Sequence, residues 1–257
     1  MIGISSPTFC QVPFQNMLVR ISEHFRLWEI LSEGEDRLEL IREDVRYGRE
    51  SLEMRFQVHV PISDVNIGSV YEPMRLAALN EVKQTILMCH QLEIPLATVH
   101  PGFIQGIAFL NKARALEKTK DSVRELAAFA HDNSVVIAIE NMPANINGTC
   151  TMASELLEVV ESADLGMCFD MGHANTSGQI NEFLRHVGRF KNVHLHNNEG
   201  NWDQHNEIDD GTADIAKIID VLRTSYEGNL IIESTDLEPG VNSKRKLEKL
   251  LGDVPAP

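Results

Sequence analysis

Histidine and carboxylate side chains recur in this sequence where short apolar runs end. The clearest case is "GMCFDMGHANTSG" (166–178), in which an apolar run ends on Asp170 and His173 follows three residues later. Apolar runs of this kind are typical of buried strands. A carboxylate and an imidazole at such a place either lie on the surface or bind something. Together, these two groups are typical ligands of zinc and manganese in proteins.

Five further apolar runs carry such residues at or near their ends, and one loop adds two more. The residues are His59 in "FQVHV", His100 in "LATVH", Glu140 in "VVIAIE", His194 and His196 in "NVHLH", Glu233 in "NLIIE", and Asp203 and His205 in the loop "NWDQHNE". Each residue alone is more often structural than functional. Lys and Arg are nearly absent from these run ends, so clustered carboxylates would be costly to desolvate without a cation. The joint pattern predicts a divalent metal site.

Eight short runs rich in Val, Ile and Leu are spread along the chain. They cover residues 2–5, 27–30, 56–60, 96–100, 135–140, 165–170, 192–196 and 229–233. Segments with helical periodicity separate most of them, at 71–92, 111–133, 151–162 and 214–226, and the charged segment 32–50 is also expected to be helical. Apolar strands that alternate with helices are typical of parallel α/β folds. Eight such units predict one (β/α)₈ TIM-barrel domain over residues 1–257, with a frayed tail at 252–257.

An open doubly wound sheet is the alternative fold. That fold predicts a glycine-rich phosphate loop after the first strand, and the sequence there, "ISSPTFCQVP", is not one. In a barrel, the carboxyl ends of all strands meet at one mouth, where active sites are built. Histidines and carboxylates far apart in sequence then lie within a few ångströms of one another, as a metal site requires.

The composition excludes some classes of function. The chain has 257 residues, of which 43% are hydrophobic, and a formal net charge of −15. Such a surface does not favour non-specific binding to nucleic-acid phosphates. The four cysteines have no ligand-like spacing and are expected to be free thiols in a reducing compartment. With no signal peptide and no membrane-spanning run, we expect a soluble, cytoplasmic protein.

Six motifs carry a resemblance to a known superfamily. In order, "HVPISDVNIGS", "VHPG", "AIEN", "FDMGHAN", "HLHNNEGNWDQH" and "IIE" resemble motifs of the xylose isomerase-like, or AP-endonuclease family 2, superfamily. This superfamily contains sugar isomerases and epimerases as well as endonuclease IV. The resemblance runs from about residue 56 to residue 233. It implies a TIM barrel that holds one to three divalent ions, zinc or manganese, at its mouth.

The resemblance implies two possible ligand sets. In endonuclease IV-like members nine residues hold three zinc ions, and the matching residues here are His59, His100, Glu140, Asp170, His173, His194, Asp203, His205 and Glu233. Sugar isomerase-like members use a subset, here Glu140, Asp170, His194 and Glu233. The family motif has an Asp three residues after the ligand His, whereas this sequence has Asn197 after His194. His196 lies on the same strand face as His194, so we expect it to point inward and contact substrate.

The resemblance favours a metal-dependent isomerase or epimerase of a sugar or sugar phosphate. In such an enzyme Glu140 and Glu233 would take and return a proton next to a metal-polarised carbonyl. Asn141, Glu29 and Trp202 are further candidates for contacts with the carbohydrate substrate.

Two other functions stay open. An endonuclease IV-like AP endonuclease is the alternative, but the Tyr-Leu pair that this enzyme wedges into DNA is replaced here by Ile62 and Ser63. The loops after the strands also lack the basic cluster that phosphate contacts need, and the basic segment 244–249 is expected to be a solvated helix face. Nucleic acid is therefore not the expected partner. The third possibility is a non-catalytic metal-binding barrel.

Overall fold

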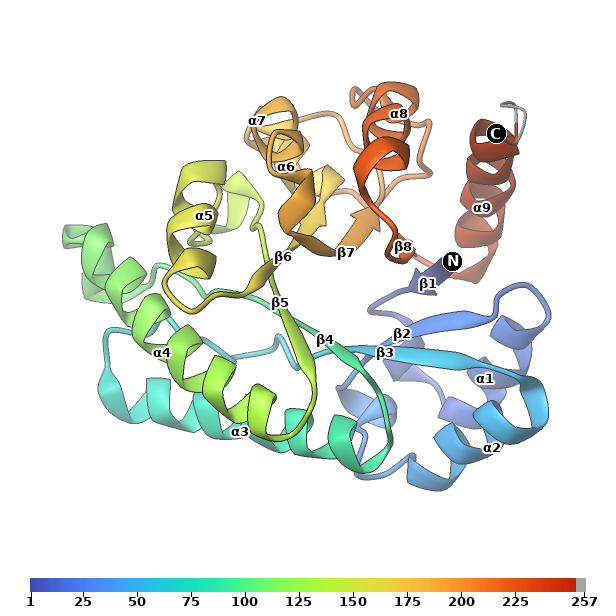
Figure 1. The fold of residues 1–257 in the computed structure, drawn as a ribbon, viewed down its shortest axis with the longest axis horizontal. Coiled ribbons are helices and arrows are strands. Elements are labelled where there is room, and N and C mark those ends of the chain that lie inside the picture. The colour runs from blue at the N-terminus through green and yellow to red at the C-terminus, as the bar shows by residue number, and fades with distance from the viewer. Residues whose placement is uncertain (253–257) are drawn as a thin grey trace.

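All eight apolar runs form strands in the computed structural model, which describes residues 1–252 (Figure 1). The strands are β1 (Ile2–Ser5), β2 (Leu27–Leu31), β3 (Arg55–His59), β4 (Leu96–Val99), β5 (Val136–Glu140), β6 (Gly166–Asp170), β7 (Phe190–Leu195) and β8 (Leu230–Glu233). They pair in parallel in sequence order, and β8 also pairs with β1, which closes the barrel. The predicted (β/α)₈ barrel is confirmed, and the open doubly wound sheet is wrong.

Helices surround the barrel. They are α1 (Phe14–Ser22), α2 (Arg42–Leu52), α3 (Glu72–Gln91), α4 (Lys112–Asp132), α5 (Ala153–Glu161), α6 (Met171–Thr176), α7 (Ile180–Leu184), α8 (Ile215–Ser225) and α9 (Leu237–Gly252). The helices predicted for 71–92, 111–133, 151–162 and 214–226 are confirmed as α3, α4, α5 and α8, and the basic segment 244–249 lies in α9. None of the described helices is both long enough and apolar enough to cross a membrane. The cytoplasmic location stays a prediction.

The prediction for residues 32–50 is only partly right. This segment contains a short 3₁₀ turn, Gly34–Asp36, and becomes α-helical only at Arg42, where α2 begins. Helix α1 was not predicted, although its apolar residues recur at helical spacing and are buried against the barrel. The tail predicted at 252–257 begins at the last residue of α9, and residues 253–257 lie outside the described part of the chain.

Aromatic side chains pack helix α1 against β2 and pack β6 against β7. The indole of Trp28 on β2 is fully buried and stacks on Phe14 of α1, with ring centroids 4.5 Å apart. Phe169 on β6 stacks on Phe190 of β7 at 4.9 Å. Because close-packed interiors resist deformation, these contacts fix the strand ends at the barrel mouth. All four cysteines are buried and free, as predicted.

The carboxylate of Asp36 lies buried with no hydrogen-bond partner for either oxygen among the described residues. Burial, together with the charge of Glu35, raises the pKa of Asp36 to about 8. The pKa of an unfolded Asp is about 3.9, so the ionised carboxylate opposes folding, and its cost grows as the pH rises from about 4 to about 8. Asp36→Asn is therefore expected to raise the melting temperature at about pH 8 and to leave it nearly unchanged at about pH 4.

Thermal unfolding followed by circular dichroism tests this prediction. The exposed Asp132→Asn serves as the matched control, because it removes the same charge from the surface. An equal shift in melting temperature at both pH values would contradict the argument.

Candidate metal centre

A cavity of about 350 Å³ opens where the carboxyl ends of the strands meet. Seven of the nine predicted metal ligands line it, namely His59, His100, Glu140, His173, Asp203, His205 and Glu233. The other two, Asp170 and His194, have no exposed surface and lie directly behind this lining. The fold therefore brings all nine candidates to one place.

Glu140, the last residue of β5, lies at the centre of the cluster. Its Oε2 is 3.0 Å from His59 Nε2 and 3.2 Å from His100 Nε2. Its Oε1 is 3.1 Å from His194 Nδ1. The two oxygens thus face different groups of candidate ligands, so Glu140 could serve as a ligand in both groups.

The imidazole and carboxylate donor atoms form three groups, and within each group all of them lie within 4.8 Å of one another; a fourth group adds Cys168 to Glu140 and His194. Site 1 is His59, His100 and Glu140; site 2 is Glu140, Asp170, His194 and Glu233; site 3 is His173, His196, Asp203 and His205. In site 2, His194 Nδ1 is 3.1 Å from Glu233 Oε1 and 3.7 Å from Asp170 Oδ2. Metal–ligand bonds of about 2.0–2.1 Å place tetrahedral donors about 3.3 Å apart. The residues present therefore fit a divalent ion.

The thiol of Cys168 also lies beside Glu140 and His194. Burial is the main reason that its pKa is raised well above the ordinary value. An ion that bound this thiol would have to displace its proton.

The second ring nitrogen of two histidines is held by a backbone carbonyl. His59 Nδ1 donates to Val60 O at 2.8 Å, and His173 Nδ1 donates to Asn141 O at 2.8 Å. In each ring Nε2 faces site 1 or site 3, where it lies beside a carboxylate and can bind an ion once it has lost its proton. Metal-binding histidines are commonly oriented in this way.

His194 has the opposite orientation, with Nδ1 toward site 2. Its Nε2 lies 2.9 Å from Oε1 of Glu29, inside the barrel. Glu29 is fully buried, and its Oε2 accepts hydrogen bonds from Gln57 Nε2 and, at 2.7 Å, from Asn192 Nδ2. A buried carboxylate therefore lies behind the imidazole of His194, on the side away from the ion.

Charge balance in the centre depends on the histidines. Burial would lower the pKa of His194, but the acidic groups around it, Cys168 first and then Glu29, Glu233 and Glu140, outweigh burial and hold this pKa well above the ordinary value. Burial would raise the pKa of Glu233, but His194 and His205 hold it far below its usual range. Among residues 1–252, only histidines form ion pairs with the four carboxylates of the centre. Without an ion, imidazole protons must therefore supply the compensating charge.

A family model described as "Xylose isomerase-like TIM barrel" matches residues 23–251. The chain belongs to this family. It is 32% identical to "Uncharacterized protein MJ1311" of Methanocaldococcus jannaschii, across 97% of this chain and 88% of the relative. These matches confirm the resemblance seen in the sequence motifs.

Solved structures of other proteins superimpose on the chain. A crystal structure of a "D-tagatose 3-epimerase-like protein" matches with a TM-score of 0.91 and 29% identity, over 98% of this chain and 97% of the other. A D-psicose 3-epimerase solved with D-fructose has a TM-score of 0.79 and 17% identity, over 98% and 99% of the two chains. At that lower identity the likeness shows a common fold.

This chain has Asn197 at the position where the motif described above has an Asp. The side chain of Asn197 has a structural role. Its Nδ2 donates to Ile208 O at 2.9 Å and to Ala213 O at 3.1 Å. Its Oδ1 accepts from the backbone N–H of Ala213 at 3.1 Å. A carboxylate has no N–H to donate, so this position needs an amide to hold the loop after β7.

The structure places none of the four predicted substrate contacts in the cavity lining. Asn141 is buried and makes two hydrogen bonds with the backbone of Asp170, at 2.9 and 2.8 Å, which fix the end of β6. Glu29 and His196 are fully buried, and Trp202 is 59% exposed on the loop after β7. Glu29, Asn141 and His196 instead contact predicted metal ligands.

Sequence reasoning missed most of the cavity walls. Besides the metal ligands, the lining comprises Ser5, Pro7, Leu31, Ile62, Ser63, Phe103, Pro143 and Ile146. These residues lie at strand ends or in the loops that follow, where no periodic pattern marks them. The available signal is their position within a few residues of a strand end, which in a barrel means proximity to the mouth.

Metal binding by this centre is expected to be strongly pH-dependent. The histidines with raised pKa values, His173 and His194 among them, are protonated near neutral pH in the metal-free protein and must lose those protons to bind an ion. Affinity should therefore keep rising as the pH increases above the ordinary histidine pKa of about 6.5. Calorimetric titration with Zn²⁺ in two buffers of different ionisation enthalpy measures the protons released, and a binding heat independent of the buffer would contradict this prediction.

Proposed function

We propose that this chain is a divalent-metal-dependent isomerase or epimerase of a small sugar. The observation that carries the proposal is the pair Glu140 and Glu233. Both Oε1 atoms lie 3.1 Å from His194 Nδ1, on strands three apart, and both residues line one cavity. That cavity, at about 350 Å³, is at the small end of the range for ligand pockets.

The walls of the cavity favour an unphosphorylated sugar. Its described lining residues include no Lys or Arg that could bind a phosphate. Leu31, Ile62 and Phe103 offer apolar surface to the C–H faces of a sugar ring or chain. The same surface limits the access of water to the reacting carbon.

In the proposed reaction, two carboxylates exchange one proton with the substrate. An ion held by Glu140, Asp170, His194 and Glu233 would polarise a carbonyl and an adjacent hydroxyl. One glutamate takes the proton from the carbon beside the carbonyl, and the other returns a proton. Return to the opposite face inverts the centre and gives epimerisation. Return to the former carbonyl carbon, with transfer of the hydroxyl proton between the two neighbouring oxygens, gives isomerisation.

The names of the structural relatives agree with this chemistry. The most similar of those described above is a D-tagatose 3-epimerase-like protein, and another is a D-psicose 3-epimerase. A ketose with five or six carbons is accordingly the first substrate class to test, with zinc or manganese as the proposed ion.

Exchange of substrate hydrogen with deuterated solvent tests the proposal directly. The metal-loaded protein is incubated in D₂O with D-tagatose, D-psicose, D-fructose and ribulose, and with the corresponding phosphates, and products are followed by NMR. We expect deuterium at the carbon beside the carbonyl of an unphosphorylated ketose, and no deuterium after Glu233→Gln. Metal binding without exchange on any of these compounds would instead indicate a non-catalytic metal-binding barrel.

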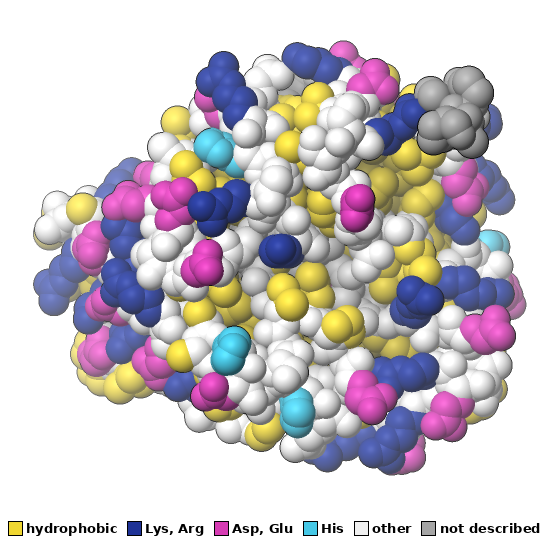
Figure 2. Space-filling view, viewed as in Figure 1, with side chains coloured by type: hydrophobic (Ala, Val, Ile, Leu, Met, Phe, Trp, Pro, Cys, Tyr) yellow, Lys and Arg dark blue, Asp and Glu magenta, His cyan; other side chains and the backbone are white. Residues whose placement is uncertain are grey.

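One observation favours AP endonuclease as a second candidate: all nine residues that match endonuclease IV ligands lie in sites 1, 2 and 3. Two observations oppose it. Ile62 and Ser63, which replace the DNA-wedging pair, line the cavity, and Glu33 accepts hydrogen bonds from the backbone N–H groups of both. On the face shown in Figure 2, the Lys and Arg side chains of the described residues lie among Asp and Glu side chains rather than in a continuous basic surface.

Incubation with a duplex that contains one abasic site separates the two candidates. We expect the wild-type protein to cleave this duplex no more than the Glu233→Gln variant does. Cleavage that requires Glu233 and metal would make phosphodiester hydrolysis the function of this centre.

A further inference from the structure

We propose that Glu33 excludes sugar phosphates from the cavity, because its carboxylate occupies the hydrogen-bond donors that would otherwise bind a phosphate at the cavity wall. Glu33 lies two residues beyond Leu31, the last residue of β2, in the loop that leads to α2. The inference rests on the proposed function, since it concerns which sugars reach the same centre. It assigns the preference for an unphosphorylated sugar to one side chain that is not itself in the cavity lining.

The side chain of Glu33 reaches across to the loop after β3. Its Oε1 accepts hydrogen bonds from the backbone N–H of Ile62 and, at 2.6 Å, from that of Ser63. Its Oε2 accepts a hydrogen bond from the hydroxyl of Ser63 at 2.7 Å. Adjacent backbone N–H groups that point at one anion are a typical anion-binding arrangement. Here the bound anion is a carboxylate of the chain itself.

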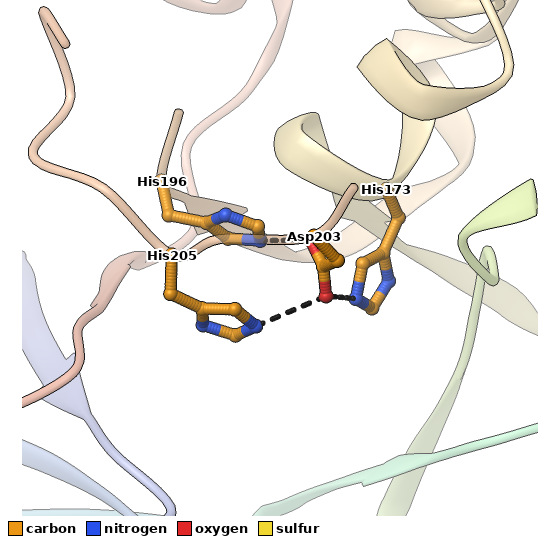
Figure 3. Close-up of side chains that lie close together, drawn as sticks. All are labelled: His173, His196, Asp203 and His205. Carbon is orange, nitrogen blue, oxygen red and sulfur yellow. Dashed lines mark hydrogen bonds and ion pairs between the residues drawn. The ribbon is translucent and has the colours of Figure 1, made fainter. Parts of the chain in front are cut away.

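The two residues that Glu33 holds, Ile62 and Ser63, belong to the wall of the cavity. Most polar side chains in that wall are candidate metal ligands, such as Asp203, which Figure 3 shows among the histidines of site 3. Apart from these ligands, the polar side chains of the described lining are Ser5 and Ser63. A phosphate that lay against this wall would therefore compete with Glu33 for the donors of Ile62 and Ser63.

The charge of Glu33 acts in the same direction as the occupied donors. Its three hydrogen-bond donors are neutral groups, so they leave the negative charge of the carboxylate in place. Like charges that are brought close together disfavour a complex, and such repulsion is a common source of specificity. A neutral sugar needs no anion-binding donors and meets no repulsion, so Glu33 discriminates against the phosphate alone.

The backbone that carries Glu33 is fixed. The N–H of Ser32 donates to O of His59 at 3.0 Å, so β2 and β3 stay side by side up to the point where their loops begin. Gly34, which follows Glu33, has a left-handed φ of 53°, and a Cβ there would lie 2.3 Å from Cys10 O. Glycine is the residue that tolerates both constraints. The carboxylate is thus presented to the loop after β3 from a defined position.

Two variants of Glu33 separate the occupied donors from the charge. Glu33→Ala removes the carboxylate and frees the donors of Ile62 and Ser63. Glu33→Gln removes the charge but can keep all three contacts, because its oxygen can accept from both N–H groups while its NH₂ group donates to the hydroxyl of Ser63. The control is Glu35→Gln, an exposed position in the same loop, which removes a nearby negative charge and leaves those donors occupied.

Binding of fructose and its phosphates tests the proposal without an assay of turnover. Calorimetry measures the affinities of the zinc-loaded wild type and variants for D-fructose, D-fructose 1-phosphate and D-fructose 6-phosphate. Both phosphates are used because either end of the sugar could lie toward Ser63. D-Fructose reports any general change in the cavity, and circular dichroism checks that each variant is folded. Contact between a phosphate and zinc is common to all the proteins and cancels when each variant is compared with wild type.

We expect Glu33→Ala to bind one of the two phosphates at least about tenfold more tightly than wild type does, because hydrogen bonds to a charged group are among the stronger ones. Its affinity for D-fructose should change much less. Glu33→Gln should show a smaller gain for the same phosphate, since only the repulsion is removed, and Glu35→Gln should match wild type. If Glu33→Ala does not fold, Glu33→Gln decides, and absence of its gain would refute the proposal.

Two further results would overturn the proposal. One is that folded Glu33→Ala binds neither phosphate more tightly than wild type does, including the case in which no protein binds them. The other is an equal gain in Glu33→Ala and Glu35→Gln, which would mean that any nearby negative charge has this effect. If no ketose exchanges deuterium, the proposed function fails, but these affinities still report the effect of Glu33. The two proposals can therefore fail separately.

Discussion

Glutamine in place of Glu140 is expected to lower kcat/KM by at least about 10³-fold, the largest effect of any single substitution in this centre. Glu140 uses both oxygens, since Oε2 faces His59 and His100 and Oε1 faces His194. Glutamine offers one acceptor oxygen and one N–H₂ group. Whichever way it turns, one of the two sites would meet a donor where it needs an acceptor.

The expected fall in kcat/KM of Glu140→Gln combines two effects that can be measured separately. General acid–base catalysis alone contributes about 10²–10⁴-fold, and the missing ligand weakens binding at sites 1 and 2. Zinc analysis should therefore show reduced metal content, and saturating metal should not restore turnover. The control is Glu227→Gln, an exposed position, which should match wild type in both measurements. A folded Glu140→Gln protein with kcat/KM within about tenfold of wild type would contradict the central role of this residue.

The barrel could be predicted because its signal is repeated. Each strand is a short apolar run, and in the structure β2 and β6 are buried at every position. The site could be located because chemistry-bearing residues such as His59 and Asp170 end their strands, and parallel strand ends meet at the mouth. Both predictions rest on patterns that are local in sequence.

The depth of a residue within the barrel could not be predicted in the same way. Glu29 was expected at the mouth because its run was placed at 27–30. The strand continues to Leu31, which is level with His59 and lines the cavity, whereas Glu29 is level with Gln57, one layer deeper. Inward-facing residues of a barrel form layers, and the layer of each depends on the register between strands. An error of one residue in a predicted strand end therefore assigns a side chain to the mouth of the barrel when it lies in the interior.

The loop after β7 was beyond prediction for another reason. Trp202 follows no periodic pattern and is exposed, and the loop that carries it is held by hydrogen bonds from Asn197 to Ile208 and Ala213. Those contacts join residues eleven and sixteen positions apart. Only the folded loop shows which of its side chains face the centre.

The deeper position of Glu29 leads to the second prediction, that Glu29→Gln weakens metal binding at site 2 by about 10–100-fold. Oε1 of Glu29 and Nδ2 of Asn192 both lie 2.9 Å from His194 Nε2. The carboxylate charge favours a proton on Nε2, which would leave Nδ1 free to bind an ion. Glutamine keeps the size of the side chain and can keep its contact with Asn192, but it removes the charge. The barrel should therefore fold as before.

The metal dependence of turnover distinguishes this positioning role from a general structural one. In Glu29→Gln the metal concentration for half-maximal activity should rise by about 10–100-fold, while activity at saturating metal should largely recover. Glu140→Gln should not recover, since Glu140 is itself a predicted ligand. A variant that had merely lost packing would show a lower melting temperature and an unchanged metal midpoint. That result for Glu29→Gln would mean that the carboxylate behind His194 only fills the interior of the barrel and does not affect the metal affinity of site 2.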